Sequence, residues 1–267
     1  MKRIQLFEFE DFSWFPNWIR ICLTRLILVM HKFLKSSDDL SDLVSEALKH
    51  SEQNTIVDLC SGSGGPMIDV FTTLKEKPET KDLKLILTDL YPNLELAKKI
   101  NDANNTSLQY NTNSVDASEV DHNLQGVRTM ICSFHHMNSE TAKKILQDAQ
   151  SSGQPICIYE ISDNSLPNIL WWIALPLNFV MTFFITPFVK PLSWKQIVFT
   201  YFIPILPFFF AWDGAVSNVR TYTVNDLDEL TKDLQSENYI WKKGILKGKA
   251  KKIYLLGLPK KGKQLSQ

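Results

Sequence analysis

The sequence contains little that would indicate a metalloprotein, a nucleic-acid-binding protein or an exported protein. Its four cysteines lie far apart, with no CxxC or Cys/His metal spacing, so we expect buried thiols in a reducing compartment and no metal site. The 29 basic and 29 acidic residues cancel, and we therefore expect no nucleic-acid partner. Acids stand in the N-terminal stretch MKRIQLFEFED where a signal peptide would need an apolar core, so we do not expect export.

Internal repeats and low-complexity tracts are also missing. Hydrophobic residues make up 44% of the chain and charged residues 22%, as in ordinary folded proteins, so disorder is not expected outside the termini. A chain of 267 residues is long enough for one large domain, or for one domain that carries an insertion.

Strand and helix patterns alternate through the middle of the chain. Two helices are expected first, at residues 14–35 and 36–50, the second capped by Ser37 or Asp38. The expected strands are at 55–59, 83–88, 108–113, 127–133 and 156–161. The expected helices between them are at 66–77, 92–103 and 139–150. Helix 224–234, capped by Asn225, and a hairpin of strands 239–246 and 251–258 follow. This order predicts a three-layer α/β sandwich with a mostly parallel sheet and a C-terminal antiparallel hairpin.

Two uncharged, aromatic-rich runs, residues 166–189 and 196–212, interrupt this alternation. They could form a transmembrane hairpin, a helical anchor that enters one leaflet, or a lid over an apolar substrate, because about 20 apolar residues span a bilayer. Lys190 and Lys195, between the runs, would lie outside in a full crossing, against the positive-inside tendency, and Pro204 and Pro207 break the second run. Partial insertion is therefore the favoured interpretation.

These patterns divide the chain into four parts. They are a helical N-terminal extension (1–50), an α/β core (51–165), a hydrophobic insertion (166–212) and a C-terminal completion of the core (213–267).

The most informative stretch runs from Ile56 to Pro66, where a buried strand ends in Asp58, a glycine-rich turn follows and a helix begins. Glycines let a backbone turn tightly and approach a ligand closely, and the helix N-terminus offers free N–H groups. The spacing G-x-G-G differs from the dinucleotide fingerprint G-x-G-x-x-G, and no G-K-[ST] of a P-loop follows. Asp58 would repel a pyrophosphate, but it could accept a hydrogen bond from the cationic amino group of a methionine moiety.

This turn resembles the first motif of class I methyltransferases that use S-adenosylmethionine (SAM), which has the form acid-x-G/S-x-G-x-G. Asp58, Gly62, Gly64 and Gly65 match it, and Ser61 stands near a position that is often glycine. The resemblance implies a Rossmann-like fold and SAM as cofactor. The alternative is a purely structural strand–turn–helix of another α/β protein.

The resemblance also implies further cofactor contacts at the ends of the next strands. Asp89 ends the second strand and would bind both ribose hydroxyls, which suits a carboxylate acceptor. Asp116 follows the third strand and would meet the adenine amino group, although a helix cap is nearly as good an interpretation. The polar end of the fourth strand opens on the ligand side of such a sheet. The predicted cofactor-binding residues are Asp58, Ser61, Gly62, Gly64, Gly65, Asp89, Asp116 and Ser133.

His135 and His136, after the fourth strand, are the candidate catalytic bases, because histidine titrates near neutral pH. Glu160 ends the fifth strand on the same side and is the third candidate. Each could instead be structural, as a hydrogen-bonded histidine or a capping acid. Several small-molecule, lipid and quinone methyltransferases carry a similar histidine pair. No Asn-Pro-Pro-Tyr or Asp-Pro-Pro-Tyr follows the strand, which argues against enzymes that methylate DNA bases or glutamine side chains.

Two polar clusters flank the hydrophobic parts of the chain and could return to the site or serve only for capping. They are Glu8, Asp11 and Arg20 in the N-terminal extension, and Asp213, Ser217, Arg220 and Tyr222 after the hydrophobic insertion. Residues 241–263 carry nine lysines and no acid, which indicates either a solvated hairpin or attraction to anionic lipid.

The expected function is methyl transfer from SAM to a small, apolar acceptor at the cytoplasmic face of a membrane. The alternative is a catalytically inactive, membrane-associated adaptor with the same fold. The acceptor atom and the oligomeric state stay open.

Overall fold

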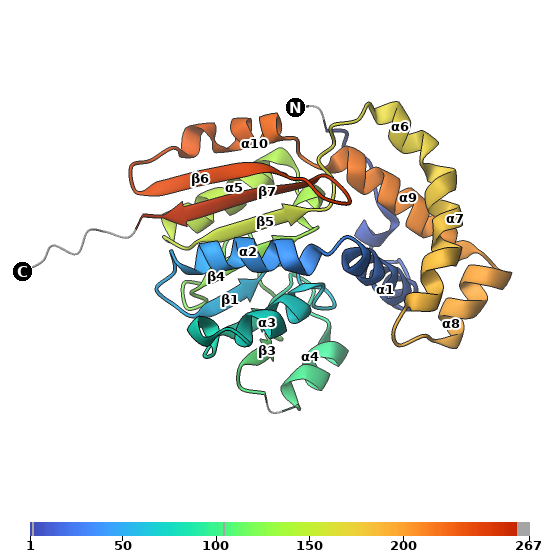
Figure 1. Ribbon diagram of the computed structural model, residues 1–267, viewed down its shortest axis with the longest axis horizontal. Helices are drawn as coiled ribbons and strands as arrows, with labels where there is room; N and C mark the ends of the chain where they lie inside the picture. Colours follow the sequence, from blue (N-terminus) through green and yellow to red (C-terminus); the bar gives the residue numbers. More distant parts are fainter. Residues whose placement is uncertain (2, 104, 261–267) are drawn as a thin grey trace, which may run out of the picture.

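A seven-stranded sheet forms the centre of the α/β core in the computed structural model, which describes residues 1, 3–103 and 105–260 (Figure 1). The strands lie in the order β3-β2-β1-β4-β5-β7-β6, and β7 runs antiparallel to both of its neighbours while the others pair in parallel. Their bounds are β1 (Thr55–Asp58), β2 (Lys84–Leu87), β3 (Leu108–Tyr110), β4 (Val127–Ile131), β5 (Ile156–Glu160), β6 (Tyr239–Leu246) and β7 (Lys252–Pro259).

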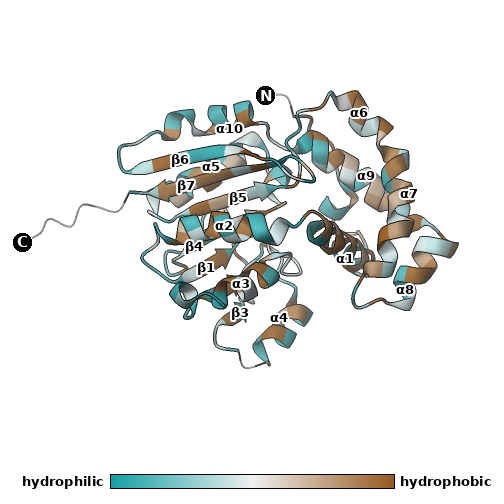
Figure 2. Ribbon diagram, viewed as in Figure 1, coloured by the Kyte–Doolittle hydropathy of each residue, from teal (hydrophilic) through white to brown (hydrophobic). Residues whose placement is uncertain are grey.

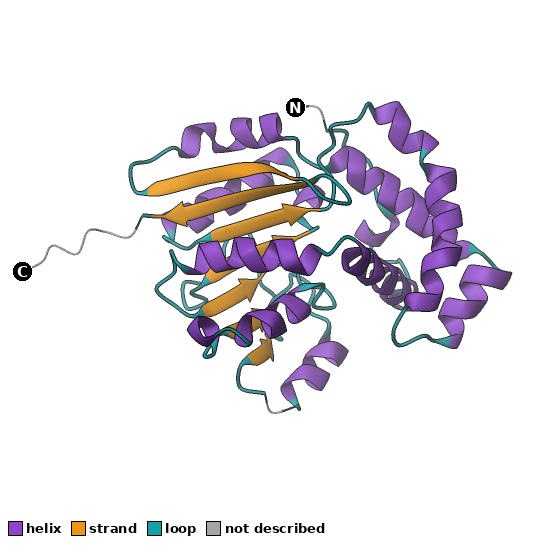
Figure 3. Cartoon of the chain, viewed as in Figure 1, coloured by secondary structure: helices purple, strands orange, loops and turns teal. Residues whose placement is uncertain are grey.

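Helices cover both faces of the sheet (Figure 3). One face packs against α2 (Ser36–Leu48), α3 (Met67–Lys75) and α4 (Leu94–Asn101), and the other against α5 (Ser139–Ser151) and α10 (Val224–Thr231). Because β1, β4 and β5 are covered on both sides, nearly all of their side chains are buried. The predicted α/β sandwich with a C-terminal antiparallel hairpin is confirmed.

Two predicted helix caps are wrong. Helix α2 begins directly after Lys35, which has a left-handed backbone, and neither Ser37 nor Asp38 caps it. Helix α10 is capped by Thr223 rather than Asn225. The Thr223 hydroxyl accepts from the backbone N–H of Asp226, and the Asp226 carboxylate accepts from the N–H of Thr223. Such a capping box satisfies two free donors at once, which a cap at Asn225 would not do.

Residues 3–35 of the N-terminal extension and the hydrophobic insertion form a helical layer beside the carboxyl ends of the parallel strands, at the right of Figure 1, whereas α2 of the predicted extension packs on the sheet. The elements of this layer are η1 (Phe9–Asp11), α1 (Asn17–Phe33), α6 (Asn168–Ile173), α7 (Leu175–Ile185), α8 (Trp194–Ile197), η5 (Val198–Phe202) and α9 (Ile205–Arg220). Leu23 and Leu26 of α1 share one apolar cluster with Ile185 of α7 and Leu206 of α9. Helix α9 continues through the predicted division between residues 212 and 213, so the insertion and the returning chain share one helix.

Much of this layer is coloured as hydrophobic in Figure 2, and many of its large apolar side chains are exposed. Those that are more than half exposed within the insertion are Ile169, Ile173, Leu177, Phe184, Phe188, Trp194, Phe202, Ile203 and Phe208, which we call the apolar patch. Within the described ranges, no single helix is both long and apolar enough to cross a bilayer. The segments Trp194–Phe202 and Ile205–Arg220 meet that test only as a pair, with a bend of 84° between them.

The lysine-rich C-terminal stretch forms the β6–β7 hairpin. Lys252 is buried, where it donates to the carbonyl of Leu34 and pairs with Asp39. Lys261 and Lys263 lie outside the described residues.

Candidate functional site

The glycine turn between β1 and α3 needs glycine for conformational reasons. Gly62, Gly64 and Gly65 have φ values of +51°, +87° and +46°, a region that residues with a Cβ rarely adopt. A Cβ at Gly64 would lie 2.6 Å from Cδ1 of Ile68, so this glycine packs against α3. At Gly62 and Gly65 a Cβ would meet no atom within 4 Å. The turn therefore keeps open space beside two of its glycines, where a ligand could approach the backbone.

Asp58 and Ser61 stabilise this turn through side-chain hydrogen bonds. The Asp58 carboxyl is buried, and it accepts hydrogen bonds from Thr129 Oγ1 at 2.6 Å and from Ser61 Oγ at 2.7 Å. Burial raises the pKa of Asp58 to about 7. Asp58 thus joins β1 to β4 and to the turn. Its predicted contact with the amino group of a ligand stays a prediction.

The carboxyl ends of β2 and β3 bring two further acids close to the turn. Asp89 accepts from the backbone N–H of Gly62 at 2.9 Å and from that of Tyr91 at 2.9 Å. The carbonyl of Asp89 accepts from Val115 N at 2.9 Å, which places the segment of Asp116 next to it. Asp116 itself accepts from the N–H and the hydroxyl of Ser118, as a local capping acid does.

At the end of β4, Ser133 and the histidine pair lie between the glycine turn and the helical layer. Ser133 is buried beside the Cys60 thiol, which stands at the start of the glycine turn. His135 belongs to η3 (Phe134–His136), and its Nδ1 lies 2.8 Å from Glu160 Oε2 at the end of β5. Burial lowers the pKa of His135, but the negative charges of Glu160 and Glu8 outweigh this, so the pKa is raised.

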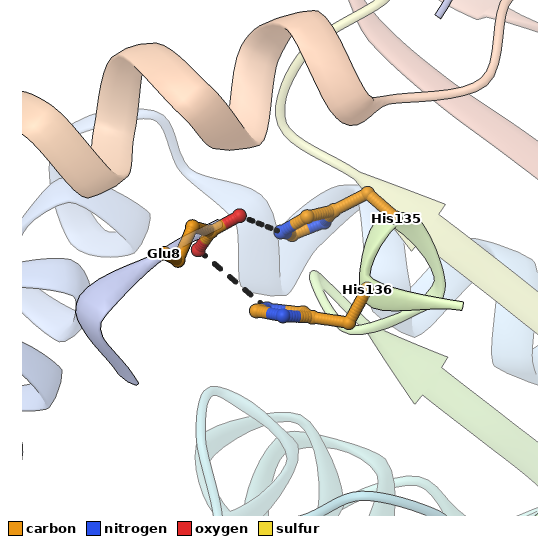
Figure 4. A group of neighbouring side chains, drawn as sticks. All are labelled: Glu8, His135 and His136. Carbon is orange, nitrogen blue, oxygen red and sulfur yellow. Dashed lines mark ion pairs between the residues drawn. The ribbon is translucent and has the colours of Figure 1, made fainter. Parts of the chain in front are cut away.

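The N-terminal extension supplies Glu8, which faces both histidines (Figure 4). Glu8 Oε1 lies 3.6 Å from His135 Nε2, and Glu8 Oε2 lies 3.8 Å from His136 Nε2. The other ring nitrogen of His136, Nδ1, lies 2.8 Å from Asp11 Oδ1. Both imidazoles are therefore held by a carboxylate at Nδ1 and point their Nε2 atoms toward a third carboxylate.

Helix α9 fixes the N-terminal extension over the end of β4. The buried Arg220 donates to Asp11 Oδ2 at 2.6 Å and to the carbonyl of His136 at 3.1 Å, and its Nη1 lies 3.2 Å from Glu8 Oε1. Asp213, about two turns earlier on the same face of α9, accepts from the backbone N–H of Phe9 at 2.8 Å. The insertion and the extension thus close one side of the site together.

These groups line a cavity of about 290 Å³, which we call the strand-end cavity. Its apolar wall comes from the helical layer and is formed by Leu23, Ile27, Met30, Met181 and Phe210. Its polar wall is formed by Glu8, Glu10, His135, His136, Glu160 and Asp213. Burial, together with neighbouring carboxylates, raises the pKa of Glu10 to about 8 and that of Asp213 to about 7. The cavity is thus apolar on one side and rich in acids and histidine on the other.

The structure brings the three predicted catalytic candidates into this one cavity, and it brings Glu8 and Asp213 of the two polar clusters there too. Sequence analysis missed Glu10, a single acid without a pattern. It also missed Arg3, which donates to the carbonyls of His135 at 2.6 Å and Met137 at 2.7 Å. The prediction of no metal site was based on cysteine spacing. That spacing gives no information about a metal site formed by Glu8 and the histidine pair.

No protein-family model matches the sequence, and no curated protein does either. The structure is similar to that of the small RNA methyltransferase HEN1, with a TM-score of 0.50 and 13% identity over 85% of this chain, which spans 25% of HEN1. It is also similar to the plantazolicin methyltransferase BpumL in complex with SAH (TM-score 0.48, 11% identity, 91% of this chain and 98% of that one). A third is a SAM-dependent methyltransferase from Aquifex aeolicus (TM-score 0.45, 10% identity, 82% and 89%). Together with the strand order, the similarity to HEN1 shows that the protein has a Rossmann-like α/β fold.

Proposed function

We propose that this protein transfers a methyl group from SAM to a small, apolar acceptor at the cytoplasmic face of a membrane. One observation carries the proposal. A glycine turn with Asp89 beside it and a cavity that holds a buried His135–Glu160 pair lie along the same edge of the sheet. In open α/β sheets this edge, at the carboxyl ends of the strands, is where ligands bind.

The cofactor would lie along the glycine turn. Open space beside Gly62 and Gly65 admits a ligand to the backbone, and the N-terminus of α3 adds a positive dipole end. Asp89 is placed to accept hydrogen bonds from ribose hydroxyls, because its carboxylate reaches the turn at Gly62. Ser133, buried at the end of β4, would be a further contact.

The acceptor would occupy the strand-end cavity. His135, in the polar wall of this cavity, stands two residues after Ser133 in the sequence. In the transfer, a lone pair of the acceptor atom forms the bond to the methyl carbon, and the carbon–sulfur bond breaks with its electron pair left on sulfur. His135 Nε2 faces the cavity and is in position to take a proton that the acceptor loses, while Glu160 orients the ring from Nδ1. The helical layer excludes water from this step.

The apolar wall of the cavity and the apolar patch on the same helical layer support an apolar acceptor drawn from a membrane. Large exposed apolar surfaces favour association, and aromatic side chains suit the membrane interface. Lys195 lies 5.4 Å from the ring of Trp18 and 5.9 Å from that of Trp194, which places a basic group beside the patch. We propose that the insertion enters one leaflet without crossing it.

The first test concerns the cofactor. Asp89→Asn should weaken SAM binding about 5- to 150-fold, because an uncharged amide loses the charge-assisted bonds to the ribose, worth about 1–3 kcal/mol. Titration calorimetry with SAM and with S-adenosylhomocysteine measures this.

The matched control is Asp121→Asn. Asp121 also accepts a backbone hydrogen bond two residues on, from Asn123, but it is exposed and belongs to the connection between β3 and β4, outside the glycine turn. It should bind SAM like the wild type. Tight binding of NAD without any binding of SAM would exclude the proposed cofactor.

The second test concerns the membrane. Phe184 and Phe202 are 71% and 76% exposed, whereas Trp171 and Trp172 are half-buried, so the phenylalanines can be changed without disturbing the core. The double variant Phe184→Ser/Phe202→Ser should lower sedimentation with phosphatidylcholine–phosphatidylserine vesicles about tenfold or more, since each buried phenyl ring contributes about 1.5–3 kcal/mol. SAM binding should not change.

Leu94→Ser serves as the control, because Leu94 is 62% exposed on α4, outside the apolar patch. Wild-type protein recovered with membranes, resistant to high salt and released by detergent, is the expected behaviour. A wild-type protein that stays monodisperse without detergent and ignores vesicles would contradict the membrane proposal and shift the acceptor toward a polar molecule.

A further inference from the structure

We propose that Glu8, His135 and His136 form a binding site for one divalent transition-metal ion of the Zn²⁺ type. Each residue offers one ligand atom, and the three atoms lie within 4.8 Å of one another (Figure 4). The three side chains come from two segments, the N-terminal extension and η3, that are distant in the sequence. One carboxylate and two imidazoles, with further positions open, form a donor set found in catalytic zinc sites.

The distances between Glu8 and the histidines fit ligands of a shared ion better than direct hydrogen bonds. The two contacts are 3.6 Å and 3.8 Å long, beyond the range of about 2.7–3.2 Å for a hydrogen bond from nitrogen to oxygen. Ligands bound at about 2.0–2.1 Å around a tetrahedral ion lie about 3.4 Å from one another. A small inward shift of the three side chains would therefore complete the site.

The second carboxylates around the histidines have the arrangement of an outer shell. Glu160 holds His135 at Nδ1, and Asp11 holds His136 at Nδ1, both at 2.8 Å. A hydrogen bond from Nδ1–H to a carboxylate fixes the tautomer that leaves the Nε2 lone pair free for a metal. Both Nε2 atoms are directed toward Glu8, so both rings are oriented to bind the same metal ion.

Unsatisfied buried atoms give independent support. His135 is 5% exposed and Glu8 is 3% exposed, yet His135 Nε2 and Glu8 Oε1 have no hydrogen-bond partner among the described residues. Glu10 Oε1 and Asp213 Oδ2, in the walls of the same cavity, also have none there. Arg220 compensates part of the negative charge, since its Nη1 lies 3.2 Å from Glu8 Oε1. A bound cation would take the lone pairs of His135 Nε2 and Glu8, and buried polar atoms are rarely left unpaired.

The ion would act on the acceptor. This role rests on the proposed methyl transfer, but the binding of the ion does not depend on that transfer. The three ligands leave coordination positions open toward the strand-end cavity. An acceptor oxygen that takes one of them would be polarised and oriented toward the cofactor. The lone pair of His135 Nε2 would then be used for the ion instead of for the acceptor proton.

The test measures metal binding to the full chain without any substrate. Protein is stripped with a chelator, dialysed and titrated with Zn²⁺ by calorimetry, and Co²⁺ is added separately to record the absorption of the bound ion. We expect one Zn²⁺ per chain. Glu8→Gln and His136→Ala should each weaken it at least 100-fold, and Asp11→Asn about 10- to 100-fold through the outer shell.

His122→Ala is the matched control, because it removes an exposed histidine outside the cluster and should leave Zn²⁺ affinity unchanged. Thermal unfolding of each metal-free variant shows whether it is folded. If Glu8→Gln does not fold, His136→Ala still tests the site. Equal Zn²⁺ affinity in wild type, Glu8→Gln and His136→Ala would overturn the proposal, as would the absence of stoichiometric binding. Zn²⁺ binding in a protein that does not bind SAM would support the metal site and contradict only the methyl transfer.

Discussion

His135→Ala is expected to lower kcat about 10²- to 10⁴-fold, the range that a positioned proton-transfer group contributes. His135 is buried at the end of β4, held by Glu160 at 2.8 Å, and its Nε2 faces the strand-end cavity. Whether Nε2 takes a proton from the acceptor or binds a cation, alanine removes it. Turnover is measured as S-adenosylhomocysteine released when SAM is supplied with a total lipid extract.

SAM affinity should change by less than about twofold in this variant, because the cofactor contacts come from the glycine turn and from Asp89, whereas a typical lost hydrogen bond changes binding more. His122→Ala is the control and should keep full turnover. Equal turnover in His135→Ala and wild type would remove His135 from the mechanism. A wild-type protein that binds SAM but releases no S-adenosylhomocysteine with any lipid extract would favour the inactive adaptor.

The strands and the glycine turn could be predicted because they depend on local sequence. A buried strand that ends in Asp58, followed by glycines at 62, 64 and 65, has few other conformations available, and the observed φ values are the ones that glycine allows. Parallel order follows when helices separate the strands, so the edge that carries Asp89, His135 and Glu160 could be predicted too. The helix caps were less certain, since neighbouring polar residues such as Thr223 and Asn225 compete for the same role.

The lining of the strand-end cavity could not be predicted in the same way. Glu8 and His135 are far apart in sequence, and their contact depends on how α9 packs under the N-terminal extension. Sequence patterns identify a hydrophobic insertion but not the face that it turns toward the site. The side chains of Leu23 and Phe210 show this, because one comes from the extension and the other from the insertion, yet both line one cavity.

The helical layer therefore contributes side chains both to the strand-end cavity and to the exposed surface. Met30 and Met181 lie at the cavity, and the residues of the apolar patch are exposed. A lid that binds lipid through the apolar patch and also lines the acceptor site would connect the membrane to the reaction without a separate carrier. This arrangement depends on the contact between α9 and the N-terminal extension, to which Arg220 contributes buried ion pairs.

Arg220→Met is expected to lower the free energy of unfolding by about 3–5 kcal/mol, the cost of breaking a buried ion pair from one side. Arg220 is 2% exposed, pairs with Asp11 at 2.6 Å and lies 3.2 Å from Glu8. Methionine keeps most of the volume but leaves the Glu8 carboxylate buried without its cation and the carbonyl of His136 without its donor. Denaturant unfolding, followed by circular dichroism, measures the change.

The control for this loss is Lys144→Met on α5, where Lys144 and its partner Glu140 are 61% and 78% exposed. Removing a solvated pair should leave the unfolding midpoint nearly unchanged. Adding Glu8→Gln and Asp11→Asn to Arg220→Met should restore part of the stability, because the charges left unpaired are then removed as well. If Arg220→Met unfolds like Lys144→Met, then α9 does not hold the N-terminal extension through this ion pair, and closure of the cavity must depend on the apolar contacts of Leu23, Leu26 and Leu206 instead.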